Sequence, residues 1–204
     1  MHYAKSGVPE GRSGDWIVER FYISDSAADC ADIDVRPTWA RASSGEYTRL
    51  RSGSVDYMTD LYEEWWSQRR AMEEALNRGG DVLVTGLGLG MFVETILRGE
   101  PSSISSVTVL EFSSEVIELV APHLNVGVPT SLTVVQADAF EWIPPAGAHF
   151  SVAWHDIWPN PCDPESVTES RQLIEKYAGF ADWQGSWALE YRDLAGLDAQ
   201  GTEG

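Results

Sequence analysis

A glycine-rich stretch near the middle of the chain is the feature that most constrains its fold. Residues 82–85 are apolar or β-branched, and a turn with the spacing Gly-x-Gly-x-Gly follows at Gly86, Gly88 and Gly90. Residues 91–97 then carry apolar side chains at helical spacing. This pattern predicts a strand, a tight turn and a helix. Residues without a Cβ let backbone amides approach a ligand at the positive end of that helix, which favours a nucleotide-like cofactor.

The spacing of these glycines argues against two common nucleotide-binding loops. The dinucleotide fingerprint has its third glycine where this chain has Met91, and Gly90 comes one position too early. A P-loop closes with Gly-Lys-Ser or Gly-Lys-Thr, and no such ending follows this turn. NAD, FAD and nucleoside triphosphates are therefore disfavoured as ligands.

Acidic residues follow three further predicted strands. Glu111 ends the first of them, about 20 residues past the glycine turn, where nucleotide-binding βαβ units place an acid that binds ribose hydroxyls. Asp138 follows a strand at 132–136, and Asp156 follows a strand at 150–155 that runs into a loop broken by prolines. Because the carboxyl ends of parallel strands meet at one edge of a sheet, these acids are expected at a single ligand-binding crevice.

Together these motifs resemble those of class I S-adenosylmethionine-dependent methyltransferases, and residues 82–90 look most like the spermidine synthase branch. The resemblance implies an α/β, Rossmann-like fold with a mostly parallel sheet and helices on both faces. It implies S-adenosylmethionine, or its decarboxylated form, as the cofactor. The glycine turn would hold the methionine part and the sugar, Glu111 the ribose, and Asp138 with Ala139 the adenine. The cofactor site so defined consists of Gly86, Leu87, Gly88, Gly90, Glu111, Phe112, Asp138 and Ala139.

The resemblance also implies a catalytic role for Asp156. In spermidine synthases the matching strand ends in an acid that takes a proton from the substrate amine, and a second acid follows where this chain has Pro159. His155 is a second catalytic candidate, because imidazole titrates near neutral pH. Adjacent residues of a strand point to opposite faces, so only one of the two is expected to face a ligand while the strand continues. The alternative for His155 is a partly buried side chain bonded to backbone.

Composition and charge indicate a globular protein with a small-molecule substrate. The chain has 14 basic and 32 acidic residues, a net charge of −18. Its basic residues after position 98 are Arg171, Lys176 and Arg192. Such a field repels phosphate backbones, so a nucleic-acid partner is disfavoured and a neutral or cationic small acceptor is expected.

Other sequence features bear on compartment, metals and assembly. No apolar run has the length of a membrane helix, and the first residues lack the apolar core of a signal peptide, so a cytoplasmic protein without a membrane partner is expected. Cys30 and Cys162 are far apart and flanked by aspartates, and we expect free thiols and no metal site. The sequence leaves a homodimer open.

The chain is expected to divide into a small β-rich segment at 1–58, a Rossmann-like cofactor-binding domain at 59–194 and a flexible tail at 195–204. A strand is predicted at 16–23, and the Ser-Gly-Ser sequence near residue 53 predicts a hairpin.

Four predictions concern helices. One helix is expected over residues 60–78, with Asp60 and Glu63 as a capping pair, and a helix over 165–177. Asp138 with Glu141 is expected to form a further capping box. Trp183, Trp187 and Tyr191 stand four residues apart and would form one helical stripe.

Three functions are weighed. The preferred one is methyl transfer to a small acceptor. An aminopropyltransferase of spermidine synthase type is the second, disfavoured by Pro159 and by Leu89 at a glycine-loop position that is commonly acidic in that family. The third is a protein that binds the cofactor without turnover.

Overall fold

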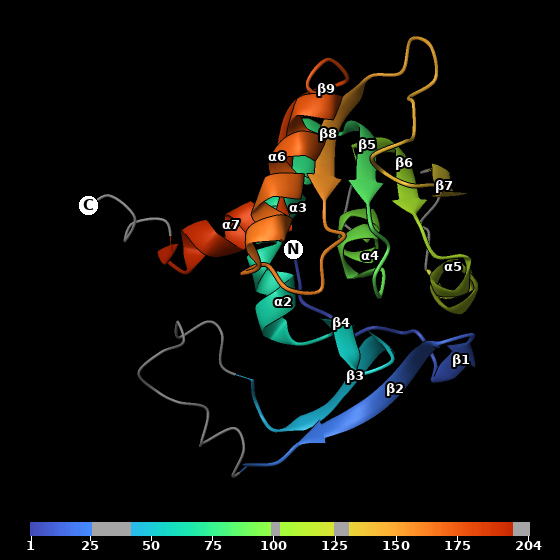
Figure 1. Ribbon diagram of the computed structural model, residues 1–204, viewed down its shortest axis with the longest axis vertical. Helices are drawn as coiled ribbons and strands as arrows, with labels where there is room; N and C mark the ends of the chain where they lie inside the picture. Colours follow the sequence, from blue (N-terminus) through green and yellow to red (C-terminus); the bar gives the residue numbers. More distant parts are fainter. Residues whose placement is uncertain (26–41, 99–102, 125–130, 198–204) are drawn as a thin grey trace.

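The computed structural model describes residues 1–25, 42–98, 103–124 and 131–197. It contains a four-stranded antiparallel sheet near the N-terminus and a five-stranded parallel sheet in the rest of the chain (Figure 1). The antiparallel sheet has the order β1 (Gly11–Ser13), β2 (Trp16–Ile23), β3 (Gly45–Ser52) and β4 (Val55–Thr59). The strand predicted at 16–23 and the hairpin predicted near Gly53 are both confirmed.

The parallel sheet has the strand order β7-β6-β5-β8-β9, and every neighbouring pair in it is parallel. Its strands are β5 (Gly80–Thr85), β6 (Ile104–Glu111), β7 (Ser131–Gln136), β8 (Phe150–His155) and β9 (Ala181–Ser186). The helices are α2 (Tyr62–Ser67), α3 (Arg69–Arg78), α4 (Met91–Leu97), α5 (Ser114–Val120), α6 (Pro164–Tyr177) and α7 (Trp187–Leu194). A sheet of this kind with helices on both faces confirms the predicted Rossmann-like α/β class.

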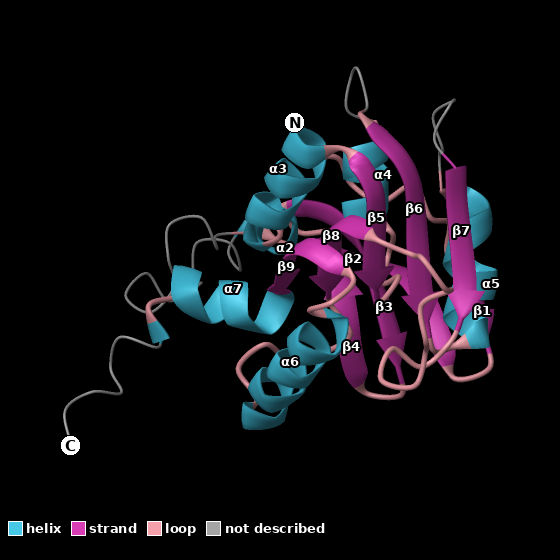
Figure 2. Ribbon diagram, turned by 90° about the horizontal axis from the view of Figure 1, so that it is seen from above, coloured by secondary structure: helices cyan, strands magenta, loops and turns pink. Residues whose placement is uncertain are grey.

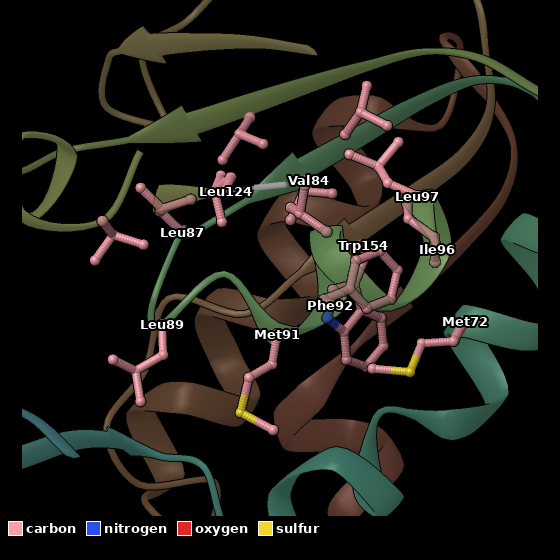
Figure 3. Close-up of a cluster of buried hydrophobic side chains, with 14 of the residues drawn as sticks. Met72, Val84, Leu87, Leu89, Met91, Phe92, Ile96, Leu97, Leu124 and Trp154 are labelled. Atoms are coloured by element: carbon pink, nitrogen blue, oxygen red, sulfur yellow. The ribbon is translucent and has the colours of Figure 1, made fainter. Parts of the chain in front are cut away.

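Successive side chains of the central strands point to opposite faces of the parallel sheet, so the core is divided into two clusters, one on each face. Val82 and Val84 of β5 belong to one cluster with residues of α3, α4 and α5, whereas Leu83 belongs to another with residues of α6. Figure 2 shows α3 and α4 on one side of the strands and α6 on the other. In the first cluster the Phe92 ring stacks on Trp154 at a centroid distance of 5.8 Å, beside Met72 (Figure 3).

Two of the predicted helical features are wrong. The helix expected over residues 60–78 is two helices, α2 and α3, separated at Gln68, whose side chain is buried. Asp60 does not cap α2 with Glu63. It is fully buried and its carboxylate accepts hydrogen bonds from the backbone amides of Ser6 and Thr48, at 3.0 and 2.7 Å, so it fixes the N-terminal segment to β3.

The expected aromatic stripe over residues 183–191 is also wrong. Trp183 lies on β9, which pairs with β8, and only Trp187 and Tyr191 share the helix α7. A spacing of four residues fits one face of a strand as well as one face of a helix. Residues 181–186 form a strand and not a helix because they pair with β8, which is distant in sequence.

The order of the strands reverses next to β5. From β5 the chain proceeds outward through β6 and β7, and it then returns to the other side of β5 for β8 and β9. Such a switch point leaves a crevice at the carboxyl ends of the two central strands. These ends face the small antiparallel sheet (Figure 1), and the two sheets enclose the cavity described next.

Candidate functional site

A cavity of about 400 Å³ lies at the carboxyl edge of the parallel sheet, a size suited to a small ligand. Its wall includes residues of both sheets and of the helices α2, α4, α5 and α7. The predicted site residues that line it are Gly86, Leu87, Gly88, Glu111, Phe112, Asp138, Ala139 and Asp156. Residues that the sequence placed on four different strand ends therefore meet in one cavity.

The glycine turn needs its glycines for two separate reasons. Gly86, Gly88 and Gly90 have φ values of 93°, 52° and 74°, which other residues rarely adopt. In addition, a Cβ on Gly86 would lie 1.9 Å from the Asp156 carbonyl oxygen, and one on Gly90 would lie 2.2 Å from Leu124. Gly90 caps α4 and does not line the cavity, so its predicted contact with the cofactor is not supported.

Most amides of this turn are already engaged within the protein. The turn amides with a partner are those of Gly86, Leu87, Leu89 and Gly90. The Leu89 amide donates to the sulfur of Met58 on β4, at 3.0 Å. Within the described turn, only the Gly88 amide makes no hydrogen bond, and Gly88 lines the cavity. Of the backbone amides expected to contact a ligand, only the Gly88 amide is therefore available as a donor.

Glu111 ends β6 with its carboxylate beside the glycine turn. It accepts hydrogen bonds from the backbone amides of Leu87 at 2.8 Å and Ser113 at 2.9 Å. Burial raises the pKa of Glu111, and these amide bonds oppose the increase. Each carboxylate oxygen has a second lone pair, so the group remains able to accept from hydroxyls of a ligand in the cavity.

Asp138 and Ala139 follow β7 and line the neighbouring part of the cavity. The Asp138 carboxylate accepts from the Phe140 amide at 2.8 Å and closes a turn. The capping box expected with Glu141 does not form, because no helix begins among residues 139–149, all of which are described. Phe112 is 74% exposed and also lines the cavity, which gives this part of it a flat apolar surface.

Asp156 comes directly after β8, and its amide continues the ladder by donating to the Thr85 carbonyl at 2.8 Å. Its side chain lines the cavity. Burial raises the pKa of Asp156 from its ordinary value of 3.8 to about 7. A carboxyl group with that pKa exchanges a proton readily near neutral pH, as a general base requires.

His155 points away from the cavity, so the pairing of His155 with Asp156 on one ligand is not supported. The imidazole is fully buried on the α6 face, between the Thr85 hydroxyl at 3.1 Å and the Gln184 side-chain oxygen at 3.2 Å, and it stacks on Tyr177. Burial lowers the pKa of His155 to about 4. The residue is a neutral core histidine bonded to side chains.

The sequence did not identify the contribution of α2 and the small sheet to this cavity. Glu64 of α2 and Gln68, just beyond it, line the cavity, together with Trp16 and Tyr57, whose ring centroids lie 4.5 Å apart. Glu64 accepts from the Thr59 amide at 2.5 Å, and burial raises its pKa well above the ordinary value. A glutamate near the start of a helix normally indicates an exposed face, which hid its role.

The charges of Asp156 and His155 predict opposite effects of pH on stability. Asp156 binds its proton more tightly in the folded chain, so its contribution is present below about pH 4 and is lost as pH rises toward 7. His155 behaves in the opposite way, losing stability as pH falls from 6.5 toward 4. Asp156→Asn removes only the first effect. Relative to the unmodified chain, this variant is expected to gain up to about 4 kcal/mol between pH 4 and 7.

Urea denaturation at closely spaced pH values measures that difference. Asp193→Asn, an exposed position on α7, is the control for the loss of one carboxylate. A flat difference for Asp156→Asn would show that burial does not perturb this carboxyl group.

The described residues contain no helix with the length and hydrophobicity needed to traverse a bilayer. They also contain no group of three histidine, cysteine or acidic side chains arranged to hold a metal ion. Cys162 is an exposed thiol, and Cys30 lies outside the described residues.

The fold and the cavity define an open parallel α/β protein with a cavity at its topological switch point, where folds of this kind bind ligands. No family model matches the sequence, and no curated protein matches it. Among solved structures, the type IIG restriction endonuclease BpuSI is 15% identical over 55% of this chain and 15% of that chain, with a TM-score of 0.38. MnmC2 from Aquifex aeolicus is 16% identical over 65% of this chain and 53% of its own, with a TM-score of 0.41.

The chain therefore spans about half of MnmC2 and a smaller part of BpuSI. Likeness at this level concerns the arrangement of the backbone and says nothing about substrate.

Proposed function

We propose that this chain is an S-adenosylmethionine-dependent transferase that moves a methyl group to a small acceptor. The observation that carries the proposal is the meeting of Glu111, Asp138 and Asp156 with the glycine turn in one cavity at the switch point of the sheet. The fold alone supports many functions, so the proposal depends on these side chains.

The residues present fit an adenosyl group. The Glu111 carboxylate faces the cavity beside the turn and would accept from the ribose hydroxyls. Asp138 would accept from the adenine amino group, next to the apolar surface of Phe112. The Gly88 amide, the one unbonded amide of the described turn, would donate to the polar end of the methionine part.

When bound, S-adenosylmethionine supplies an activated methyl carbon, and the electron pair of its carbon–sulfur bond remains on sulfur as the acceptor lone pair forms the new bond. The chain must then orient the acceptor and remove its proton. Asp156 is the residue proposed for this task, because its carboxyl group lines the cavity and titrates near neutral pH. Trp154 and Trp158 also line the cavity and help to exclude water.

One observation favours the aminopropyltransferase alternative. Among the described residues, the charged side chains that line the cavity are all acidic, and no lysine, arginine or histidine is available for the carboxylate of the methionine part. The decarboxylated cofactor lacks that group. Against this alternative, Pro159 replaces the second acid of spermidine synthases and is exposed outside the cavity.

Thermal denaturation with a panel of ligands tests the proposal and separates the alternatives. The panel is S-adenosylmethionine, its decarboxylated form, S-adenosylhomocysteine, methylthioadenosine and NAD. A ligand at a hundred times its dissociation constant should stabilise the fold by about 2.7 kcal/mol. We expect this effect from S-adenosylmethionine and S-adenosylhomocysteine, and none from NAD.

Stronger stabilisation by decarboxylated S-adenosylmethionine than by the parent compound would favour aminopropyl transfer. Binding of S-adenosylmethionine with no consumption in the presence of any acceptor would favour a non-catalytic role. A shift with NAD alone would contradict the proposal.

A further inference from the structure

Two carboxyl groups line the part of the cavity that is not assigned to the adenosyl group, and no basic side chain among the described residues lines the cavity beside them. Glu64 and Asp156 come from α2 and from the end of β8, and both line the cavity. Burial raises the pKa of Glu64, and the charge of Asp156 raises it further. Two partly desolvated acids in one cavity are costly to ionise together unless a cation lies between them. The pair is therefore better matched to a positively charged ligand than to a neutral or anionic one.

A third polar group on the same wall is without a partner. The Gln68 side chain is 1% exposed and lines the cavity, and its carbonyl oxygen accepts no hydrogen bond. A buried acceptor left unpaired costs about 1–3 kcal/mol, and a donor from a ligand would recover part of that cost. An ammonium group has several N–H donors, enough to reach both carboxyls and this oxygen.

The remaining wall around these three groups is apolar. The small sheet contributes Trp16, Leu50 and Tyr57, and the loop after Asp156 contributes Ile157 and Trp158. Aromatic faces attract a cation and also pack against an apolar substituent. Outside the part assigned to the adenosyl group, no second acidic pair lines the cavity among the described residues. The wall therefore suits a ligand that carries one positive charge and is otherwise uncharged and apolar.

We propose that the acceptor is a monoamine, bound in its alkylammonium form with its nitrogen between Glu64 and Asp156 and one N–H directed to the Gln68 oxygen. This inference rests on the proposed function for the position of the adenosyl group. The ammonium nitrogen gives one proton to the Asp156 carboxylate, which frees its lone pair to form the bond to the methyl carbon. The methylated product carries the positive charge again and stays paired with Glu64.

Binding of matched probes tests this inference without turnover. The protein is titrated with n-butylamine, n-hexylamine and benzylamine, and with the alcohol and the carboxylate of the same shape in each case, with and without S-adenosylhomocysteine. At least one amine should bind ten-fold or more tightly than its alcohol, and no carboxylate should bind. Amine binding should also release protons from the acidic pair, which calorimetry detects in buffers of different ionisation enthalpy. Amines that bind no better than their alcohols would overturn the inference.

Glu64→Gln removes the charge but keeps an oxygen that can accept from the Thr59 amide. It should weaken amine binding ten-fold or more, leave alcohol binding unchanged and leave the shift with S-adenosylhomocysteine unchanged. Glu63→Gln, the adjacent residue of the same helix, does not line the cavity and should leave amine binding unchanged. Equal weakening in both variants would assign the effect to general charge and overturn the role of Glu64.

A further titration with a diamine tests whether the site binds one positive charge or two. Binding of 1,4-diaminobutane ten-fold tighter than n-butylamine would overturn the assignment of a monoamine. Failure of the proposed function has a different signature, since it appears as no thermal shift with any adenosyl ligand. Failure of this inference appears as an adenosyl shift without preference for amines.

Discussion

Gly86→Ala is expected to be among the most destabilising single substitutions in this chain. The residue has a φ of 93°, and an added Cβ would meet the Asp156 carbonyl oxygen at 1.9 Å and its carbonyl carbon at 2.8 Å. Backbone atoms at the end of β8 cannot move aside as a flexible side chain could. Backbone strain of about 1–2 kcal/mol and overpacking of about 1–3 kcal/mol together predict a loss of about 2–5 kcal/mol.

Gly147→Ala is the matched control for this substitution. Gly147 has a φ of 81°, but an added Cβ would have no atom within 4 Å. Only the backbone strain applies there, so a loss of about 1–2 kcal/mol is expected in urea denaturation followed by circular dichroism. If the two variants lost equal stability, the close approach of the glycine turn to Asp156 would have no energetic consequence.

Glu111→Ala is expected to remove most of the stabilisation by S-adenosylmethionine. Hydrogen bonds to a charged group contribute about 1.5–3 kcal/mol each, so losing two bonds to the ribose predicts a loss in affinity of 100-fold or more. The substitution also leaves the amides of Leu87 and Ser113 without their acceptor. The thermal shift must therefore be measured against the melting temperature of the unliganded variant itself.

Two comparisons separate cofactor binding from other effects of Glu111→Ala. Glu141→Ala, an exposed acid in the turn after Asp138, should retain the full shift. Asp156→Asn should also retain nearly the full shift while abolishing turnover, because Asp156 is assigned to the acceptor. An equal loss of shift in the Glu111 and Asp156 variants would contradict this division of roles.

The elements that local pattern decides were predictable from the sequence. The strand at β2 and the strand, turn and helix around Gly86 follow from alternation, β-branched residues and glycine spacing, and each lies where expected. The acids at the ends of β6, β7 and β8 were predictable for the same reason, since parallel strands of a switch-point sheet bring their carboxyl ends together.

Features decided by contacts distant in sequence were not predictable. The break at Gln68 interrupts a stretch whose composition suits one continuous helix, and it accompanies burial of the Gln68 side chain. β9 forms because it pairs with β8, although its aromatic residues also fit a helix. Glu64 joined the site only because the small sheet and α2 close over the carboxyl edge of the parallel sheet.

The shared wall of the cavity has an evolutionary consequence. The residues proposed to face an adenosyl group come from strand ends of the large sheet, whereas Trp16, Tyr57 and Glu64 come from a different part of the chain. If the proposed function holds, descendants of this protein could change the acceptor through mutations in the first seventy or so codons, with the proposed methyl-donor site inherited intact.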